Sequence, residues 1–547
     1  MAQQDQDVMY YNNYLFLLLP MVLLLIVKFR LPRKHGGKNL PPGPWRLPVI
    51  GSLHHLVGAL ALPHRALRDL ARAYDAPLML LHLGELEVTV ASSAGAASEI
   101  MKTHDAAFAT RPRTATMRAL TRDGLGIAFA PHGEHWRQAR KLSTTGLLGA
   151  RQVRSQRGAR EVETAALVAT VASLSSASGP MNVSFLLSAY ITDVVTRTVL
   201  GHRIGALRDE FLERLDEGVK LVVGFSLADL FPSSRLARAF SGALRRAELL
   251  SREMSQLMDR ITEEHRARGM SAGTRDEEED LLDVLLRIQA DGGIDGPLDN
   301  RTIRAIITDM FAAGSESTST TIEWAMAELM RAPAALLRAQ SEVRGTFAGE
   351  SRVREEALPE LHYLHLVIKE TLRLHPVAPL LLPRECLEPR RVLGYDVPKG
   401  VMVLINAWAI GRDTASWGAD AEEFRPERFE EAGAAAPDFR GTNFEFVPFG
   451  AGRRMCPRIS SGSSPMGQGW AVAHPVHPLP PPLPGITFGL AVLELALASL
   501  LFHFDWELPA GSSGELDMAE AVGAAVRRMS DLRLHATVRV PVPAPTL

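Results

Sequence analysis

The run Phe449-Gly-Ala-Gly-Arg-Arg-Met-Cys456-Pro457-Arg458 carries more information about this 547-residue chain than any other segment. Its glycines at positions 450 and 452 permit a tight turn and a close approach of the backbone to a planar ligand. A cysteine follows them beside two arginines, and this combination can hold an iron porphyrin through one axial sulfur. A lone cysteine in such a turn more often belongs to an ordinary loop than to a haem site. The spacing of the whole motif is therefore needed to tell the two apart.

The complete spacing resembles the cytochrome P450 signature Phe-x-x-Gly-x-Arg-x-Cys-x-Gly at every position but the last, where this chain has Arg458. The resemblance implies that Cys456 is the axial ligand of haem b (iron protoporphyrin IX), whose thiolate ligand favours O–O cleavage. Arg454 suits a haem propionate, because a guanidinium binds a carboxylate in a fork. The other expected residues of this haem-binding loop are Phe449, Gly450 and Gly452.

The signature is interrupted directly after the cysteine. The family's continuation, Gly485-Ile-Thr-Phe-Gly489, comes only after the interval Arg458–Pro484, and deleting that interval would rejoin the motif in register. The interval is rich in proline, glycine and serine and has no helix pattern, so it predicts loop or disorder. We interpret it as translated intron sequence or a faulty gene model. A tolerated surface insertion is the alternative, because long loops cost little closure entropy.

Composition bounds the remaining possibilities. The chain is 46% hydrophobic, so it can bury a large core, and its net charge of −2 gives no nucleic-acid footprint. Its two cysteines, Cys386 and Cys456, exclude a disulfide framework and fit a reducing compartment.

The N-terminal segment predicts a membrane anchor. Tyr14–Val27 is nearly all apolar, and tyrosines can extend it toward the roughly 20 residues of a typical span. Basic residues follow within positions 28–38, whereas the first ten residues carry only acidic charge, so the positive-inside rule places the rest of the chain in the cytosol. A cleaved signal peptide would need basic residues before the apolar run and a small-residue site after it, and the sequence has neither.

These features predict three segments along the chain. Residues 1–30 form the anchor, residues 31–51 form a basic and proline-rich hinge, and residues 52–547 form the catalytic domain, with 458–484 as an aberrant insertion. Helical periodicity dominates this domain, including a long helix from about 300 to 330, while short strand patterns recur. The strand patterns lie at 78–91, 392–397, 401–405 and 532–540. The expected fold class is therefore mainly α with small β-sheets (α+β), as in the P450 fold that the resemblance implies.

Two charged residues lie one helical turn apart in Glu370-Thr-Leu-Arg373, within a rather apolar segment. Such a pair is usually a surface salt bridge of little value. Here it resembles the P450 Glu-x-x-Arg pair, and Arg428 in Phe424-Arg-Pro-Glu-Arg-Phe429 resembles the arginine that joins it. The resemblance implies a buried triad that is stable only when every partner is present.

The run Ala313-Gly-Ser-Glu-Ser-Thr318 lies inside the expected long helix although glycine and hydroxyl residues are poor helix formers. It is either a weak point in a core helix or a distortion that opens a pocket for O₂. It resembles the P450 motif Ala-Gly-x-Asp/Glu-Thr, which implies proton delivery by Glu316 and Ser317, with Thr318 beside them. Ser317 replaces the usual threonine, so it keeps the hydroxyl but lacks the methyl group that fixes the rotamer.

Two further motifs resemble family contacts to the haem propionates. Trp136-Arg-Gln-Ala-Arg140 places an indole and a guanidinium four residues apart, which is either routine packing or the P450 Trp-x-x-x-Arg pair. Arg384 in Leu382-Pro-Arg-Glu385 resembles another propionate contact, with less specificity.

The resemblance as a whole implies a plant microsomal monooxygenase of the largest plant clan. Such an enzyme would insert one oxygen atom from O₂ into a small apolar terpenoid, indole or phenolic metabolite. It would be a monomer on the endoplasmic reticulum membrane, spanning it once. NADPH–cytochrome P450 reductase would supply electrons from NADPH, with cytochrome b5 as a second donor. The expected pocket positions are 110–127, 306–313, 377–381 and 524–525.

Two alternatives remain open at this point. A P450-fold isomerase or dehydratase would need no reductase, but such enzymes usually lose the acid–hydroxyl pair that Glu316 and Ser317 represent. A haem-free product of a damaged gene is favoured by the interval Arg458–Pro484.

Overall fold

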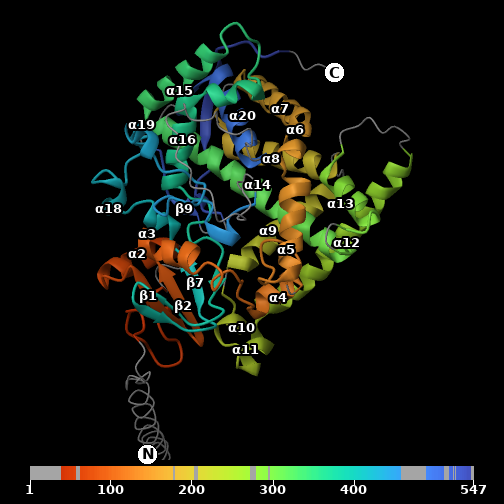
Figure 1. Ribbon diagram of the computed structural model, residues 1–547. Helices are drawn as coiled ribbons and strands as arrows, with labels where there is room; N and C mark the ends of the chain where they lie inside the picture. The colour runs from red at the N-terminus through yellow and green to blue at the C-terminus, as the bar shows by residue number, and fades with distance from the viewer. Residues whose placement is uncertain are drawn as a thin grey trace, which may run out of the picture.

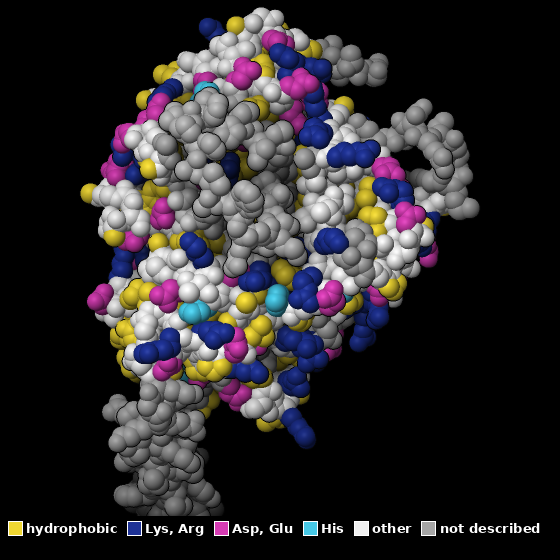
Figure 2. All heavy atoms as spheres, in the orientation of Figure 1, with side chains coloured by type: hydrophobic (Ala, Val, Ile, Leu, Met, Phe, Trp, Pro, Cys, Tyr) yellow, Lys and Arg dark blue, Asp and Glu magenta, His cyan; other side chains and the backbone are white. Residues whose placement is uncertain are grey.

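The structure is a computed structural model that describes residues 39–56, 62–122, 124–176, 179–201, 207–223, 225–271, 279–293, 296–457, 488–509, 516–521, 523 and 525–543. The expected anchor (1–30), residues 31–38 of the expected hinge and the interval 458–484 lie outside these residues. The described part is mostly helical with small sheets, as the sequence predicts (Figure 1). On the face shown in Figure 2, basic, acidic and apolar side chains are interspersed.

The largest sheet has four strands in the order β1-β2-β7-β4 and lies in the lower part of the molecule as drawn in Figure 1. Strands β1 (Leu78–Leu83) and β2 (Leu86–Ala91) form an antiparallel hairpin, so the predicted strand patch 78–91 is confirmed. Strand β7 (Met402–Ile405) pairs parallel to β2, and β4 (Arg384–Glu385) pairs antiparallel to β7. This sheet therefore places residues near positions 90 and 384 on either side of β7.

Three smaller sheets complete the β-structure, and they confirm the predicted strands near 392–397 and 532–540. They consist of β3 (Met181–Asn182), β11 (Arg533–Val538) and β8 (Phe504–Glu507), of β5 (Arg390–Val392) with β6 (Tyr395–Val397), and of β9 (Glu520–Ala521) with β10 (Arg527–Arg528).

The long helix α14 (Asn300–Arg331) runs through the middle of the molecule (Figure 1), where the sequence predicts it. The Asp299 side chain caps its first turn by accepting a hydrogen bond from the Thr302 N–H group, which satisfies a donor that the helix leaves open. Helices α8 (Val183–Leu200), α16 (His362–Leu374) and α20 (Phe488–His503) pack around it.

The other α-helices complete the described helical part of the fold. They are α2 (Pro63–Ala73), α3 (Ala94–Ser98), α4 (Ala115–Thr121), α5 (Glu134–Lys141), α6 (Ala150–Ser155), α7 (Arg157–Ser175), α9 (Leu207–Val223), α10 (Leu227–Leu230), α11 (Arg235–Phe240), α12 (Gly242–Ser271), α13 (Leu281–Ala290), α15 (Pro333–Thr346), α17 (Ala407–Ile410), α18 (Thr414–Trp417) and α19 (Glu427–Glu431).

Among the described residues, α8 is the one helix that is long and apolar enough to cross a membrane by length and composition. However, 61% of its apolar stretch is buried, and the helix packs against α14. It is therefore a core helix of the folded domain.

The charged residues of the expected triad meet in the core. Glu370 and Arg373 on α16 are 0% and 1% exposed, and Arg428 on α19 is 8% exposed. The Glu370 carboxylate accepts hydrogen bonds from Arg373 Nε (2.7 Å) and Arg428 Nε (2.9 Å), and also from the Arg425 backbone N–H group (2.8 Å). Since charge-assisted hydrogen bonds surround the buried carboxylate, its desolvation is offset.

The remaining N–H groups of the two arginines donate hydrogen bonds to backbone carbonyl groups. Arg373 donates to the carbonyl oxygens of Gly411 and Ala421, and Arg428 donates to that of Asp420. The backbone approaches so closely that a Cβ at Gly411 would lie 2.4 Å from the Arg373 carbonyl oxygen. The triad thus fixes the segment 411–428 against α16.

We predict that Glu370→Gln destabilises the chain by about 3–5 kcal/mol, because two buried guanidiniums lose their counter-charge. Glu430→Gln is the matched control, since it removes an exposed ion pair with Arg338 and should cost less than about 1 kcal/mol. Urea unfolding followed by circular dichroism measures both. Equal stability of the two variants would contradict the structural role of the triad.

Candidate functional site

A cavity of about 500 Å³ lies between α14 and the segment that precedes the interval. Cys456 and Phe449 line it on one side, and Glu316, Ser317 and Thr318 of α14 line it as well. Its size is that of a small-molecule pocket. All four predicted pocket ranges contribute lining residues, although position 524 lies outside the described residues.

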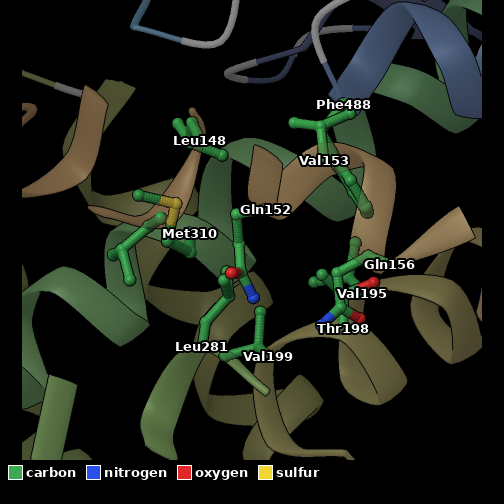
Figure 3. A pocket seen from close by; sticks show the side chains of 11 residues that line it. Leu148, Gln152, Val153, Gln156, Val195, Thr198, Val199, Leu281, Met310 and Phe488 are labelled. Carbon is green, nitrogen blue, oxygen red and sulfur yellow. The ribbon is translucent and has the colours of Figure 1, made fainter. Parts of the chain in front are cut away.

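A second cavity, shown in Figure 3, has a volume of only about 20 Å³. Apolar side chains such as Val153, Val199 and Phe488 surround it, and it has room for about one water molecule. Leu148 and Met310 separate it from the large cavity, because they line both. Only the larger of these two cavities can hold an organic ligand.

The cysteine loop closes on itself through tight backbone geometry. Gly450 and Gly452 have positive φ angles of 69° and 67°, which glycine adopts at little cost. At Gly452 a Cβ would lie 2.3 Å from the Met101 carbonyl oxygen. The Cys456 N–H group donates to the Phe449 carbonyl oxygen (3.0 Å), so the loop returns to its starting residue.

Asp105 holds this loop from outside, and sequence reasoning did not find it. Its carboxylate accepts hydrogen bonds from the Arg453 backbone N–H group (3.0 Å) and from Arg453 Nη1 (2.9 Å). It also contacts Arg384 Nη1 at 3.4 Å, and Arg384 Nη2 donates to the Ala451 carbonyl oxygen (2.8 Å). No motif surrounds Asp105 in the sequence, and the loop lies more than 340 residues away.

Four guanidiniums gather beside the loop, from Arg111, Arg140, Arg384 and Arg454, and all four line the cavity. Burial, and then repulsion from Arg384 and Arg140, lowers the pKa of Arg454 to about 9. Burial also lowers the pKa of Arg111, reinforced by the other three arginines. Asp105 is the carboxylate that opposes them, so the site carries surplus positive charge.

The arginines differ in what they bind. Arg454 donates to the carbonyl oxygens of Ala109 and Ala130 (both 2.5 Å), and Arg111 donates to that of Ala128 (2.8 Å). These two therefore position backbone segments as well as contributing charge. Arg111 lies in the predicted pocket range 110–127, but the sequence analysis did not single it out, because its role depends on carbonyl groups of other segments.

Trp136 and Arg140 have unused capacity for a carboxylate ligand. The Trp136 Nε1 group is buried and has no hydrogen-bond partner within the described part of the chain. The Arg454 guanidinium lies 4.2 Å from the centre of the Trp136 ring. Buried polar groups rarely stay unpaired in native proteins. Surplus positive charge, an orphan indole N–H group and the Cys456 thiol together fit a haem with its two propionates.

The α14 wall presents hydroxyl and carboxyl groups to the same cavity. Ser317 Oγ donates to the Ala313 carbonyl oxygen one turn earlier (2.5 Å), and Thr321 Oγ1 donates to the Ser317 carbonyl oxygen (2.8 Å). The helix runs through this stretch without interruption, so the expected distortion is not a break in the helix. Glu316 is half-buried, and burial raises the pKa of its carboxyl group.

Asp309, one turn before Ala313, also lines the cavity. It lies in the predicted pocket range 306–313, but the sequence analysis gave it no role of its own. Its Oδ2 atom accepts hydrogen bonds from the backbone N–H groups of Ile127 (2.5 Å) and Ala128 (3.0 Å). A Cβ at Gly126 would lie 2.2 Å from that oxygen, so a larger residue there would displace the Asp309 carboxylate. Since Arg111 and Arg454 bind carbonyls of the same segment, residues 126–130 are clamped between α14 and the arginines.

The first turn of α20 closes the cavity beside the cysteine. Gly489, Leu490 and Leu493 line it together with Cys456 and Pro457, although the interval separates them along the chain. The residues on either side of the interval therefore belong to one site.

The comparisons with known proteins agree with this geometry. The family model described as Cytochrome P450 matches residues 41–457. Desmethyl-deoxy-podophyllotoxin synthase of Sinopodophyllum hexandrum is 42% identical over 94% of this chain and 96% of its own length. Premnaspirodiene oxygenase of Hyoscyamus muticus is 42% identical over 92% and 93%. The solved structure of a zebra fish cytochrome P450 with abiraterone is 25% identical, with a TM-score of 0.66 over 87% of this chain and 100% of that one.

We predict that Asp309 gives the chain a characteristic pH dependence. Burial raises its pKa from 3.8 to about 6, against the opposing hydrogen bonds from Ala128 and Ile127. The folded protein therefore keeps a proton on Asp309 that the unfolded chain releases, and stability falls as pH rises from about 4 through 6. Urea unfolding should show this fall relative to Asp309→Asn, with no further change above about pH 7.

Asp299→Asn, on the same helix, is the control for this measurement. Burial would raise the pKa of Asp299, but hydrogen bonds from Thr302 hold it below its usual value. Its stability difference should therefore change in the opposite direction, growing as pH rises. A pH-independent difference for Asp309→Asn would contradict the account of the clamp.

Proposed function

Because the chain belongs to the cytochrome P450 family of monooxygenases, we propose that it inserts one oxygen atom from O₂ into a small plant specialised metabolite. The observation that carries this proposal is the single cavity that holds Cys456, the surplus arginines and the Glu316–Thr318 segment together. The printed names of its relatives, a synthase and an oxygenase of plants, support an oxidative role. A terpenoid, indole or phenolic substrate fits the apolar part of the cavity.

In this proposal Cys456 is the axial ligand, and Trp136, Arg140, Arg384 and Arg454 hold the propionates. A thiolate-ligated haem, when bound, supplies the activation of O₂. Arg140 is the arginine best placed to pair with a propionate, because its guanidinium forms no hydrogen bond with any described residue. The other arginines use some guanidinium donors to bind backbone carbonyl groups of other residues, and their remaining donors can bind a propionate.

Glu316, Ser317 and Thr318 would deliver protons from the α14 side. Burial raises the pKa of Glu316, which brings a carboxyl group closer to the pH at which it can both take and give a proton. The Ser317 hydroxyl donates to the Ala313 carbonyl oxygen, so the same oxygen is free to accept a hydrogen bond from a group bound in the cavity that Ser317 lines. Thr318 is buried beside it.

An apolar wall would hold the substrate and exclude water from the reacting end. It is made chiefly by α4, α9 and α12. The residues of this wall are Leu120, Leu215, Val219, Val222, Leu250, Met254 and Met258. Burying the substrate against them would contribute about 25 cal/mol for each Å² of apolar surface.

We also propose the cellular setting that the sequence predicts. Residues 1–30 would anchor the chain once in the endoplasmic reticulum membrane, with the catalytic domain in the cytosol. NADPH–cytochrome P450 reductase would deliver the electrons, with cytochrome b5 as a second donor, and the protein would act as a monomer. The proposed domain limits are those given by the sequence.

The interval Arg458–Pro484 would be absent from the active product. The family match ends at residue 457, directly before the interval begins. Residues on both sides of it line one cavity, which supports a site built by the rejoined sequence. Sequencing the transcript tests this proposal, since a message that encodes residues 458–484 would contradict it.

The isomerase or dehydratase alternative is less well supported. Enzymes of that kind usually lack the acid and hydroxyl pair, and here Glu316 and Ser317 both line the cavity. Product formation that requires NADPH and reductase would separate the monooxygenase from such an enzyme.

We predict a thiolate-type Soret band in the reduced carbon-monoxide difference spectrum of the chain that lacks residues 458–484. Cys456→Ser in that chain should abolish the band while the fold remains, because serine keeps the shape but loses the thiolate. The full chain should give a weaker band or none. A band of equal strength in the full chain would mean that the interval is tolerated, and no band in either chain would favour the haem-free product.

We predict that Ser317→Ala lowers product formed per NADPH consumed, with a fall in turnover of up to about 100-fold, because a proton-delivering hydroxyl is lost. Ser317→Thr is the matched control, since it keeps the hydroxyl and adds the methyl group that fixes the rotamer. It should equal or exceed the wild type in coupling. Unchanged coupling in Ser317→Ala would remove Ser317 from the proposed proton path.

A further inference from the structure

The end of the large cavity away from the cysteine is lined by three guanidiniums. Arg122 follows the last turn of α4, and Arg301 and Arg304 lie in the first two turns of α14. From Arg304 to Ala313 the helix rises about 14 Å, at roughly 1.5 Å per residue. The basic end and the proposed reacting end therefore lie at opposite ends of one apolar chamber.

The charges at this end are incompletely balanced. Arg304 pairs with Asp259, and Arg301 lies 3.5 Å from Asp299. Arg122 forms no ion pair among the described residues, and its guanidinium makes only two long contacts, both 3.4 Å, to the hydroxyl and carbonyl oxygens of Ser251. Neither Asp259 nor Asp299 lines the cavity, so the lining surface presents only positive charge here.

The surroundings of Arg122 disfavour its own charge. Burial lowers its pKa first, then repulsion from Arg304, which Asp259 partly opposes, and finally repulsion from Arg301. Partly desolvated positive charge that lacks a counter-ion is costly. An anion bound at this end would relieve both the desolvation and the repulsion.

The backbone at Arg122 is also unusual. Its φ angle is +49°, in the left-handed region that few residues other than glycine adopt. Its N–H group donates to the Arg118 carbonyl oxygen and ends α4. This conformation places an arginine at a position where glycine or asparagine would be less strained, and such strain concentrates at functional sites.

We propose that the substrate is an amphipathic acid, whose carboxylate binds Arg122 beside Arg301 and Arg304 and whose apolar body reaches toward Ala313. The proposal rests on the proposed function and specifies its substrate class. The apolar wall of α9 and α12 lies between the two ends and suits the body of such a molecule. A guanidinium binds a carboxylate through two parallel hydrogen bonds, which gives direction as well as affinity.

The carboxyl groups of the cavity favour this orientation over the reverse one. Asp309 and Glu316 both lie farther along α14 than Arg304, toward the reacting end. In the proposed holoenzyme the haem propionates would neutralise the four arginines beside Cys456. A substrate carboxylate at that end would then face the carboxyl groups of Asp309 and Glu316, whereas an apolar group there would not. The acid is therefore held away from the reacting end, and the carbon that reaches Ala313 belongs to the apolar body.

The test measures binding of two fluorescent probes of similar shape, 4-(1-pyrene)butyrate and the neutral 4-(1-pyrene)butanol, by fluorescence anisotropy on the purified full chain. We expect the wild type to bind the acid at least about tenfold more tightly than the alcohol. Arg122→Gln should remove most of that preference and leave the alcohol unchanged. Added salt should weaken the acid alone, because it screens the charges.

Arg214→Gln is the matched control. Arg214 lines the same cavity, but its guanidinium is paired with Glu253 at 2.8 Å, so the acid preference should survive this change. Equal binding of acid and alcohol by the wild type would overturn the proposal. Acid binding that depends on Arg140 rather than Arg122 would overturn it too, because the probe would then occupy the propionate-binding arginines.

This result is separable from the proposed function, because anisotropy requires neither haem nor turnover. A carbon-monoxide band without acid preference would leave the monooxygenase standing and refute the substrate class. Acid preference that depends on Arg122 in a chain without the band would support the basic subsite and refute the oxygenase.

Discussion

The buried carboxylate of Glu370 is the constraint on which the rest of the structure depends. It is fully enclosed and accepts hydrogen bonds from Arg373, Arg428 and a backbone N–H group. The two arginines then bind the carbonyl groups of residues 411–423. A surface pair would contribute less than about 1 kcal/mol, whereas breaking a buried one costs about 3–5 kcal/mol. One acidic side chain thus fixes the approach to the cysteine loop.

The cost of an unpaired buried charge also applies to the cavity. It distinguishes charged groups that are paired within the protein from groups that need a ligand as their partner. In the triad every donor and acceptor is matched within the chain. Beside Cys456 four arginines face one aspartate, and Trp136 keeps a buried N–H group unpaired. At the other end of the cavity Arg122 pairs with no carboxylate among the described residues. Surplus charge of one sign in a partly desolvated space marks the places where a molecule of opposite charge belongs.

Sequence reasoning succeeded where the signal was local. The strand patch 78–91 and the helix near 300–330 follow from periodicity, and the spacing of Glu370 and Arg373 placed them on one helix face. It missed Asp105, and it placed Arg111 and Asp309 in pocket ranges without giving them a role. All three bind backbone groups of other segments. Backbone partners leave no pattern of residue types. The sequence left open whether 313–318 is a weak point in a core helix or a distortion. In the structure the serine and threonine hydroxyls donate to carbonyls one turn earlier, and the helix continues through the run.

Stability and function make different demands on the junction after Cys456. Closure entropy grows slowly with loop length, so the core formed by α14, α16 and α20 can assemble with or without additional residues there. The cysteine loop is less tolerant, because Gly452 has a Cβ position already occupied by the Met101 carbonyl group, and Asp105 binds the next residue. The first turn of α20 lines the cavity beside Pro457. The segment that joins Pro457 to α20 must therefore add neither bulk nor charge to the cavity wall. This condition comes from ligand binding, because the fold itself does not require it.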